Sequence, residues 1–470
     1  AGVAKAKADV ILVSGHTGGT GASPQSSIKY AGIPWEMGLA EVHQVLTLNR
    51  LRDKVVLRTD GGLKTGRDIV MAAMLGAEEF GIGTASLVAM GCIMVRQCHS
   101  NTCPVGVCSQ LPELRAKFDG TPEKVVNLFS FIAEEVREIL AQLGFRSLKD
   151  VIGRSDLLSQ VSRGSQYLDD LDMNPILAQA DAGTSARYCT MTGRNEVPDT
   201  LDAQMIKDAE PLFRDGEKMQ LQYNVRNTHR AVGTRLSSMI TRKFGMTGLP
   251  ADHLTVRLRG SAGQSLGAFA VQGVKLEVFG DANAYAGRGL WGGTTVVRPL
   301  VSSPLVPNLN PVIGNTVLYG ATAGKLFAAG QAGERFAVRN SGAEVVVEGC
   351  GSNGCEYMTG GNAVILGQVG TNFGAGMTGG MAVVYDPDGQ FEQRVNPETV
   401  QWQRIATPYG EGLCHDLIAQ HVAATNSLHA ATILNDWSRE KAKFWQVVPK
   451  EMAARLEHPL TLDGAGAKRA

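Results

Sequence analysis

The sequence lacks an excess of either charge, and it lacks any long hydrophobic run. Its 470 residues contain 45 Lys and Arg against 45 Asp and Glu, so the formal net charge is zero. Nucleic-acid binders and polybasic proteins of membrane surfaces need an excess of positive charge, so we expect neither kind of partner. A run of about 18 apolar residues is absent, which predicts no membrane-spanning helix. Residues 1–5 do not have the layout of a signal peptide.

Proline and aromatic residues are also scarce, at 18 prolines and 6% aromatic residues. The low proline content and the absence of a Gly-X-Y period exclude a collagen-like chain. Two common motifs are missing as well. No C-x-x-C pair occurs, which disfavours zinc, and no G-x-G-x-x-G opens a predicted helix, which disfavours NAD. The 44% of hydrophobic residues argues against global disorder.

The amino-terminal part alternates short apolar runs with helical patterns. Strands are predicted at 10–13, 55–58 and 79–83, and helices at 36–50 and 67–75. This alternation is typical of parallel β/α units. Each predicted strand ends in small or polar residues, so the loops that follow are candidates for a binding site.

Glycine is the residue in surplus. Residues 256–390 hold 27 of the 56 glycines, which punctuate short β-type runs such as 343–349 and 362–367. Repeats at intervals of about 15 to 30 residues indicate the coils of a β-solenoid, with glycine at corners that need a positive φ. A β-sandwich is the alternative, and the scarcity of tight hairpin signals favours the solenoid.

Four of the eight cysteines are clustered, at Cys92, Cys98, Cys103 and Cys108. A disulfide framework is a poor explanation in a chain of this length without a secretion signal. Spacings of five, four and four intervening residues, with a proline after Cys103, favour an iron–sulfur cluster over zinc. Ordinary buried thiols are the alternative, and the spacing leaves open whether three or four cysteines are ligands.

Two glycine turns precede the cysteines. Asp60-Gly61-Gly62 ends the second predicted strand, and Gly83-Thr84 ends the third. In a β/α barrel the loops after the last two strands commonly bind a phosphate through backbone N–H groups. Beside a redox cluster, these turns predict a phosphate-bearing redox cofactor, and FMN fits better than NAD. A tight structural turn is the alternative for each of them.

Four segments in combination resemble the large subunit of glutamate synthase. They are Ser14-Gly-His-Thr-Gly-Gly-Thr-Gly-Ala-Ser-Pro24, Thr59-Asp-Gly-Gly62, Gly83-Thr-Ala85 and the loop of Cys92, Cys98 and Cys103. The glycine-rich region 226–390 is similar to the carboxyl-terminal domain of the same family. The resemblance runs from Val10 to about Leu456.

The resemblance implies an α/β and all-β architecture: the carboxyl-terminal part of an FMN-binding (β/α)8 barrel, a right-handed β-helix and a short helical tail. We expect the barrel part at 1–165, a connector at 166–225, the β-helix at 226–395 and the tail at 396–470. The implied ligands of a [3Fe–4S] cluster are Cys92, Cys98 and Cys103, which leaves Cys108 outside the ligand set. The implied FMN-binding residues are Asp60, Gly61, Gly62, Gly83 and Thr84.

The implied reaction transfers the amide nitrogen of L-glutamine reductively to 2-oxoglutarate and gives two L-glutamate. FMN would donate a hydride to 2-iminoglutarate, and the [3Fe–4S] cluster would relay electrons to FMN. The implied partners are the rest of the large subunit and a small NADPH-oxidising subunit with FAD and [4Fe–4S], or ferredoxin, in an oligomer. Cluster assembly implies a reducing, cytoplasmic location.

The sequence begins at Ala1 without an initiator methionine, and three strands are predicted before the cysteine loop. A β/α barrel needs eight strands. We therefore expect a piece of a longer polypeptide, whose other part carries the glutaminase domain and most residues that act on 2-oxoglutarate. The alternative function is a non-catalytic scaffold and electron-relay piece of a larger FMN oxidoreductase.

Overall fold

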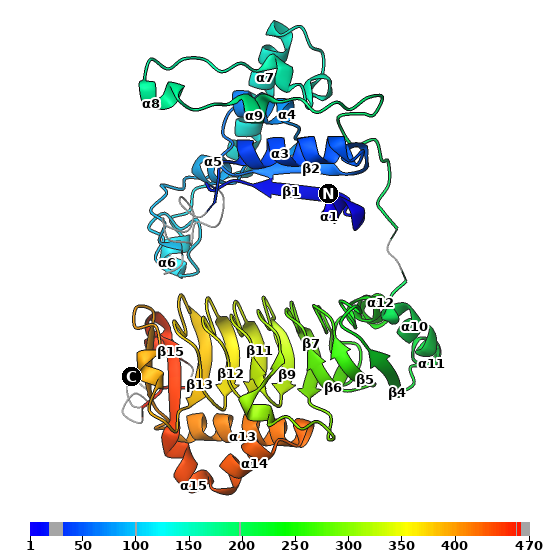
Figure 1. Cartoon of the computed structure of the whole chain (residues 1–470). Coiled ribbons are helices and arrows are strands. Elements are labelled where there is room, and N and C mark those ends of the chain that lie inside the picture. Colours follow the sequence, from blue (N-terminus) through cyan, green and yellow to red (C-terminus); the bar gives the residue numbers. More distant parts are fainter. Residues whose placement is uncertain (18–31, 99–100, 197–198, 457, 462–470) are drawn as a thin grey trace. The chain divides into compact units, whose positions relative to one another are not determined.

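The computed structural model describes residues 1–17, 32–98, 101–196, 199–456 and 458–461. The chain forms two compact units, Ala1–Val197 and Pro198–Ala470, whose elements are labelled in Figure 1. No hydrophobic cluster of described residues combines side chains from both units. The first unit mixes a small parallel sheet with helices, and the second is dominated by one long sheet, in coarse agreement with the predicted fold class.

The first unit is built on a parallel sheet in the order β1-β2-β3. Its register pairs Ser14 with Asp60, and Thr59 with Phe80, so the strands end at one edge. Its elements are α1 (Gly2–Lys5), β1 (Val10–Ser14), α3 (Trp35–Leu48), β2 (Val56–Asp60), α4 (Gly66–Met74), β3 (Glu79–Phe80), α5 (Thr84–Ala89), α6 (Pro112–Arg115), α7 (Pro122–Gln142), α8 (Gln166–Asp169) and α9 (Asn174–Leu177).

Local sequence signals explain where these elements begin and end. Thr65 and Asp68 form a capping box at the start of α4, and Pro122 occupies the first turn of α7. The apolar face of α3, with Leu39 and Leu46 fully buried, packs on β1 and β2. The predicted strands and helices are confirmed to within three residues at each end. The largest difference is in β3, which ends at Phe80 because the chain turns there toward α5.

The second unit holds a sheet of twelve strands, in which β4 to β13 pair in parallel and β13, β15 and β14 pair antiparallel. Pairing partners recur every 18 or 19 residues, as in the row Lys325, Glu344, Asn362 and Met381. The strands are β4 (Met219–Val225), β5 (Leu254–Ala262), β6 (Val274–Ala282), β7 (Trp291–Arg298), β8 (Pro311–Ile313), β9 (Ala323–Ala328), β10 (Gln331–Ala332), β11 (Ser341–Val347), β12 (Thr359–Ile365), β13 (Gly379–Tyr385), β14 (Val400–Arg404) and β15 (Phe444–Pro449).

Helices flank this sheet at several places. They are α10 (Leu201–Asp208), α11 (Glu210–Asp215), α12 (Thr234–Phe244), α13 (Pro408–Thr425), α14 (Leu428–Asn435) and α15 (Trp437–Glu440). Helix α13 packs across β7, β9, β11 and β12, on the face that Figure 1 shows below the strands. Residues 396–470, expected as a helical tail, also contain β14 and β15. Among the described residues, no helix combines the length and the apolarity needed to cross a membrane.

The connections between the strands repeat an unusual backbone. Three residues with positive φ, each separated by one residue, occur in six successive repeats. These triplets are Ser265, Gly267 and Phe269; Tyr285, Gly287 and Gly289; Thr316, Leu318 and Gly320; Arg335, Ala337 and Arg339; Asn353, Cys355 and Tyr357; and Asn372, Gly374 and Gly376. Glycine, which we expected at such corners, fills only a third of these positions.

Hydrogen bonds between repeats explain how other residues tolerate this backbone. The N–H of Thr316 donates to the carbonyl of Glu334 in the next repeat at 2.8 Å, and the N–H of Leu318 donates to Ala286 in the preceding repeat at 2.9 Å. A left-handed conformation costs a non-glycine residue about 1–2 kcal/mol. Each hydrogen bond returns about 1 kcal/mol and spares a buried N–H from being unpaired.

Candidate cofactor and cluster site

The carboxyl edge of the three-stranded sheet opens onto a cavity of about 410 Å³. The loops after β2 and β3 line it, and so does the start of the cysteine loop. All five predicted cofactor residues and two of the predicted cluster ligands meet there. The lining residues are Thr17, Asp60, Gly61, Gly62, Leu63, Gly81, Ile82, Gly83, Thr84, Leu87, Cys92, Met94, Arg96 and Cys98.

The glycines of the two turns are required for different reasons. Gly61 and Gly62 have φ values of +110° and +107°, which favour glycine. A Cβ on Gly62 would lie 2.7 Å from the hydroxyl oxygen of Thr17, whose side chain donates a hydrogen bond to the carbonyl of Gly61. A Cβ on Gly83 would meet nothing within 4 Å. The first turn is therefore closed by the loop after β1, and the second leaves open space.

Asp60 presents an unsatisfied polar atom at this edge. Its Oδ1 atom is buried and has no hydrogen-bond partner among the described residues. A carboxylate oxygen accepts hydrogen bonds and repels anions. The Asp60 side chain therefore suits a donor group of a ligand, whereas a phosphate suits the backbone N–H groups of the turns. The glycine-rich motif after β1 continues through residues 18–24, which lie outside the described residues.

Arg96 is a cation on this cavity that the sequence reasoning missed. It lies between Cys92 and Cys98, and both Arg96 and Met94 have positive φ, near 60°. The available signal was the presence of an arginine inside a predicted cofactor loop. A guanidinium beside two glycine turns can neutralise a bound phosphate.

The four clustered cysteines line a second cavity, of about 210 Å³. All four are free thiols, and Cys103 is buried. Burial alone would raise the pKa of the Cys103 thiol, but backbone and thiol hydrogen bonds, chiefly from residues 105–108, outweigh it and lower that pKa. Burial, followed by hydrogen bonds with Cys98 and Cys103, raises the pKa of Cys108 to about 12.

The two cavities share one wall. The residues that line both are Leu87, Cys92, Met94, Arg96 and Cys98. Within the described part of the chain, no three His, Cys, Asp or Glu residues are arranged to hold a single metal ion. In an iron–sulfur cluster each cysteine binds a different iron, so the sulfur atoms need not converge on one point. The donor set, four free thiols around one cavity, fits a cluster.

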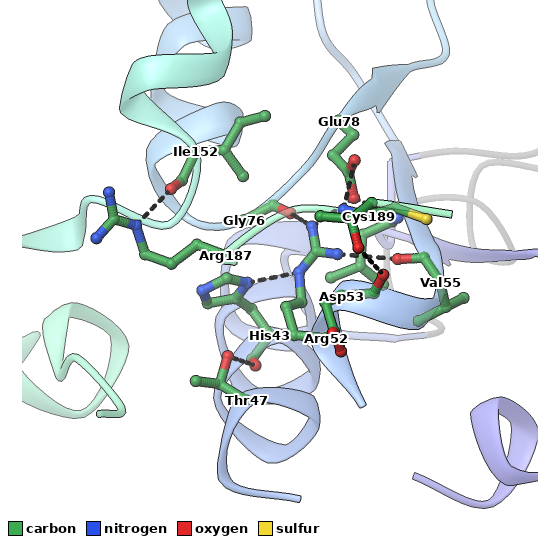
Figure 2. A network of polar contacts seen from close by, with 12 residues as sticks. His43, Thr47, Arg52, Asp53, Val55, Gly76, Glu78, Ile152, Arg187 and Cys189 are labelled. Atoms are coloured by element: carbon green, nitrogen blue, oxygen red, sulfur yellow. Dashed lines mark hydrogen bonds and ion pairs between the residues drawn. The ribbon is translucent and has the colours of Figure 1, made fainter. Parts of the chain in front are cut away.

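A buried polar network lies elsewhere in the first unit (Figure 2). Arg52, which is 1% exposed, donates from Nε to Nδ1 of His43 at 3.1 Å. It also donates to the carbonyls of Val55 and Gly76, each at 2.9 Å, and forms an ion pair of 2.6 Å with Glu78. Burial, then the charge of Arg52, lowers the pKa of His43 to about 3, so this histidine is neutral.

The same network fixes a distant segment of the unit. The second carboxylate oxygen of Glu78 accepts a hydrogen bond of 3.0 Å from the N–H of Cys189. The N–H of Thr190 donates to the carbonyl of Asp53 at 2.9 Å. Because every polar group of Arg52 is directed at a protein atom, this network is structural and supports the sheet rather than a ligand.

Comparison with known families places both units. Residues 202–450, more than half of the chain, match the family described as "GXGXG motif", and the chain belongs to that family. Residues 1–146 match the family described as "Conserved region in glutamate synthase".

Individual relatives confirm the resemblance seen in the sequence. Over 465 residues, 99% of this chain, it is 75% identical to the glutamate synthase [NADPH] large chain of Azospirillum brasilense and covers 31% of that protein. It is 47% identical, over 97% of its length, to 30% of the Bacillus subtilis glutamate synthase [NADPH] large chain. It is 49% identical, over 96% of its length, to 29% of the ferredoxin-dependent glutamate synthase 2 of Synechocystis. The chain thus spans less than a third of these relatives.

One solved structure, a flavocytochrome b2 double variant with sulfite bound, matches 36% of this chain and 37% of its own at 17% identity. Its TM-score of 0.22 supports no argument about the fold.

Proposed function

We propose that this chain is part of a glutamate synthase large subunit. In this proposal, residues 1–165 form the carboxyl-terminal part of an FMN-binding β/α barrel, 166–225 a connector, 226–395 a right-handed β-helix and 396–470 a tail. The two units divide within the proposed connector. The observation that carries the proposal is the shared wall between the cavity of the glycine turns and the cavity of the cysteines.

The first cavity suits FMN. The N–H groups at the start of α5, beside Gly83 and Thr84, have no partners within that helix and are available to phosphate oxygens. Arg96 supplies the compensating charge, and the Asp60 carboxylate accepts a hydrogen bond from a hydroxyl group of the cofactor. When bound, FMN supplies hydride transfer to 2-iminoglutarate.

The second cavity suits a [3Fe–4S] cluster on Cys92, Cys98 and Cys103. Cys92 and Cys98 line both cavities, so a cluster held there lies next to the flavin site and can relay electrons to it. The electron donor in this proposal is a small NADPH-oxidising subunit with FAD and [4Fe–4S], or ferredoxin. The enzyme is cytoplasmic, and glutamine and 2-oxoglutarate are its substrates.

The long sheet of the second unit supports the β-helix part of the proposal. Its parallel strands recur every 18 or 19 residues in the row from Lys325 to Met381, and the triplets of positive φ recur with them. A coil of constant length that returns to an adjacent parallel strand is the repeating unit of a solenoid. We assign this part a scaffold role.

A chimaera tests the proposal. The aligned stretch of the Azospirillum brasilense large chain is replaced by this chain, and NADPH oxidation that depends on glutamine and 2-oxoglutarate is measured with the partner subunit. We expect activity comparable to the parent enzyme. Cys98→Ser should abolish the electron paramagnetic resonance (EPR) signal of the cluster and the activity, whereas Cys189→Ser, a cysteine of the same unit remote from the cavities, should preserve both.

The rival function is a scaffold and electron-relay piece of a different FMN oxidoreductase. The observation that favours it is the small sheet of the first unit, which has three strands among the described residues. A chimaera that binds FMN and the cluster but consumes neither glutamine nor 2-oxoglutarate would support this rival and contradict the synthase proposal.

A further inference from the structure

Cys108 shares its surroundings with the three proposed cluster ligands. It lines the same cavity of about 210 Å³ as Cys92, Cys98 and Cys103, and its thiol is hydrogen-bonded to those of Cys98 and Cys103. The sequence places Cys98, Cys103 and Cys108 at equal intervals of five residues. A cluster on three cysteines would therefore leave a fourth thiol on the wall of its own cavity.

The loop holds Cys108 in this place by its backbone. Gly106 has a φ of +74°, and a Cβ there would lie 2.2 Å from the carbonyl oxygen of Leu114, so the chain turns sharply between Cys103 and Cys108. The base of the loop is closed because the hydroxyl of Ser109 donates to the carbonyl of Asn101 at 2.8 Å. The side chain of Asn101 also accepts the N–H of Gln110 at 2.6 Å.

We infer that Cys108 is the ligand of a fourth iron, so that this site converts between [3Fe–4S] and [4Fe–4S] clusters. The inference rests on the proposed function, which supplies the three-iron cluster. A four-iron cluster takes four cysteine thiolates, and a three-iron cluster lacks one iron and one ligand. The cavity offers the missing thiol, and the chemical class of the ligand is ferrous iron.

The conversion balances without an external oxidant. Reduced [3Fe–4S]⁰ takes up Fe²⁺ and becomes [4Fe–4S]²⁺, with no net transfer of electrons. The Cys108 S–H bond breaks, the sulfur binds the added iron, and the proton passes to solvent. A cluster that starts as [3Fe–4S]⁺ first accepts one electron, which dithionite supplies in the experiment below.

The test is uptake of ⁵⁷Fe²⁺ by the full chain under anaerobic conditions with dithionite, followed by Mössbauer and EPR spectroscopy. The parent chain should bind one labelled iron per cluster and lose the EPR signal of the oxidised three-iron cluster. Cys108→Ser and Cys108→Ala should keep that signal, which shows that the loop is folded, and should bind no label. Cys189→Ser should behave as the parent does.

Two outcomes would overturn the inference and leave the proposed function intact. One is a parent chain that keeps its three-iron signal and refuses the label. The other is equal uptake of label by the parent and both Cys108 variants. If no three-iron cluster assembles in any preparation, the cluster part of the proposed function fails together with the inference.

Discussion

Gly62 and Gly83 line the same cavity but differ in what an added methyl group would meet. Gly62 has a φ of +107°, and its Cβ would lie 2.7 Å from the Thr17 hydroxyl oxygen. Gly62→Ala should therefore destabilise the first unit by about 1–3 kcal/mol in urea unfolding. Gly83 has a negative φ and open space around its Cβ, so Gly83→Ala should change stability by less than about 0.5 kcal/mol.

The same pair of variants separates folding from binding. The methyl group of Gly83→Ala occupies space beside the start of α5, where we place the FMN phosphate, so FMN titration should show weaker binding. Unchanged FMN affinity in a stable Gly83→Ala variant would remove Gly83 from the phosphate site. A large loss of stability in that variant would contradict the open space seen around Gly83.

Arg52 and Arg58 provide a second matched pair, because both form ion pairs with glutamates near β2. Arg52→Met would leave Glu78 and two carbonyl groups of a buried network without their donor, and should cost the first unit about 3–5 kcal/mol. Arg58 pairs with Glu79 at the surface, where it is 48% exposed, and Arg58→Met should cost at most about 1 kcal/mol. Chemical denaturation of both variants measures the difference, and equal costs would contradict the structural role of Arg52.

The repeated connections of the second unit have an energetic signature at Asn372. Its Nδ2 donates to Oδ1 of Asn353 at 2.8 Å, and its Oδ1 accepts from Asn396 at 2.7 Å, so equivalent asparagines form a ladder across three repeats. Asn372 also has a φ of +60°. Asn372→Ala loses the ladder and keeps the backbone strain, whereas Asn372→Gly loses the ladder and relieves the strain.

Urea unfolding should therefore rank the glycine variant above the alanine variant by about 1 kcal/mol, after the greater chain entropy of unfolded glycine is deducted. Both variants should be less stable than the parent by about 1–2 kcal/mol for two exposed hydrogen bonds. An alanine variant as stable as the glycine variant would show that the left-handed backbone carries no strain at this position.

Comparing elements shows what the sequence could and could not predict. Parallel strands must end at one edge, so the meeting of Asp60, Gly83 and the cysteine loop followed from strand assignment and motif order. The repeat length of the long sheet followed from glycine spacing. The triplet of Arg335, Ala337 and Arg339 did not, because a left-handed L-residue becomes affordable only after neighbouring repeats supply its hydrogen bonds. Arg52 and Arg96 were missed because burial and cavity lining depend on tertiary contacts.

The division into two units, each with its own cores, predicts two separate unfolding transitions in calorimetry. Metal bound only to the native state stabilises the unit that holds it, so removal of iron with a chelator should lower one transition and leave the other unchanged. Arg52→Met identifies the transition of the first unit, since its network lies wholly within that unit. The chelator and Arg52→Met should therefore lower the same transition. A single cooperative transition, or a chelator effect on the transition that Arg52→Met leaves unchanged, would contradict a cluster site confined to the first unit.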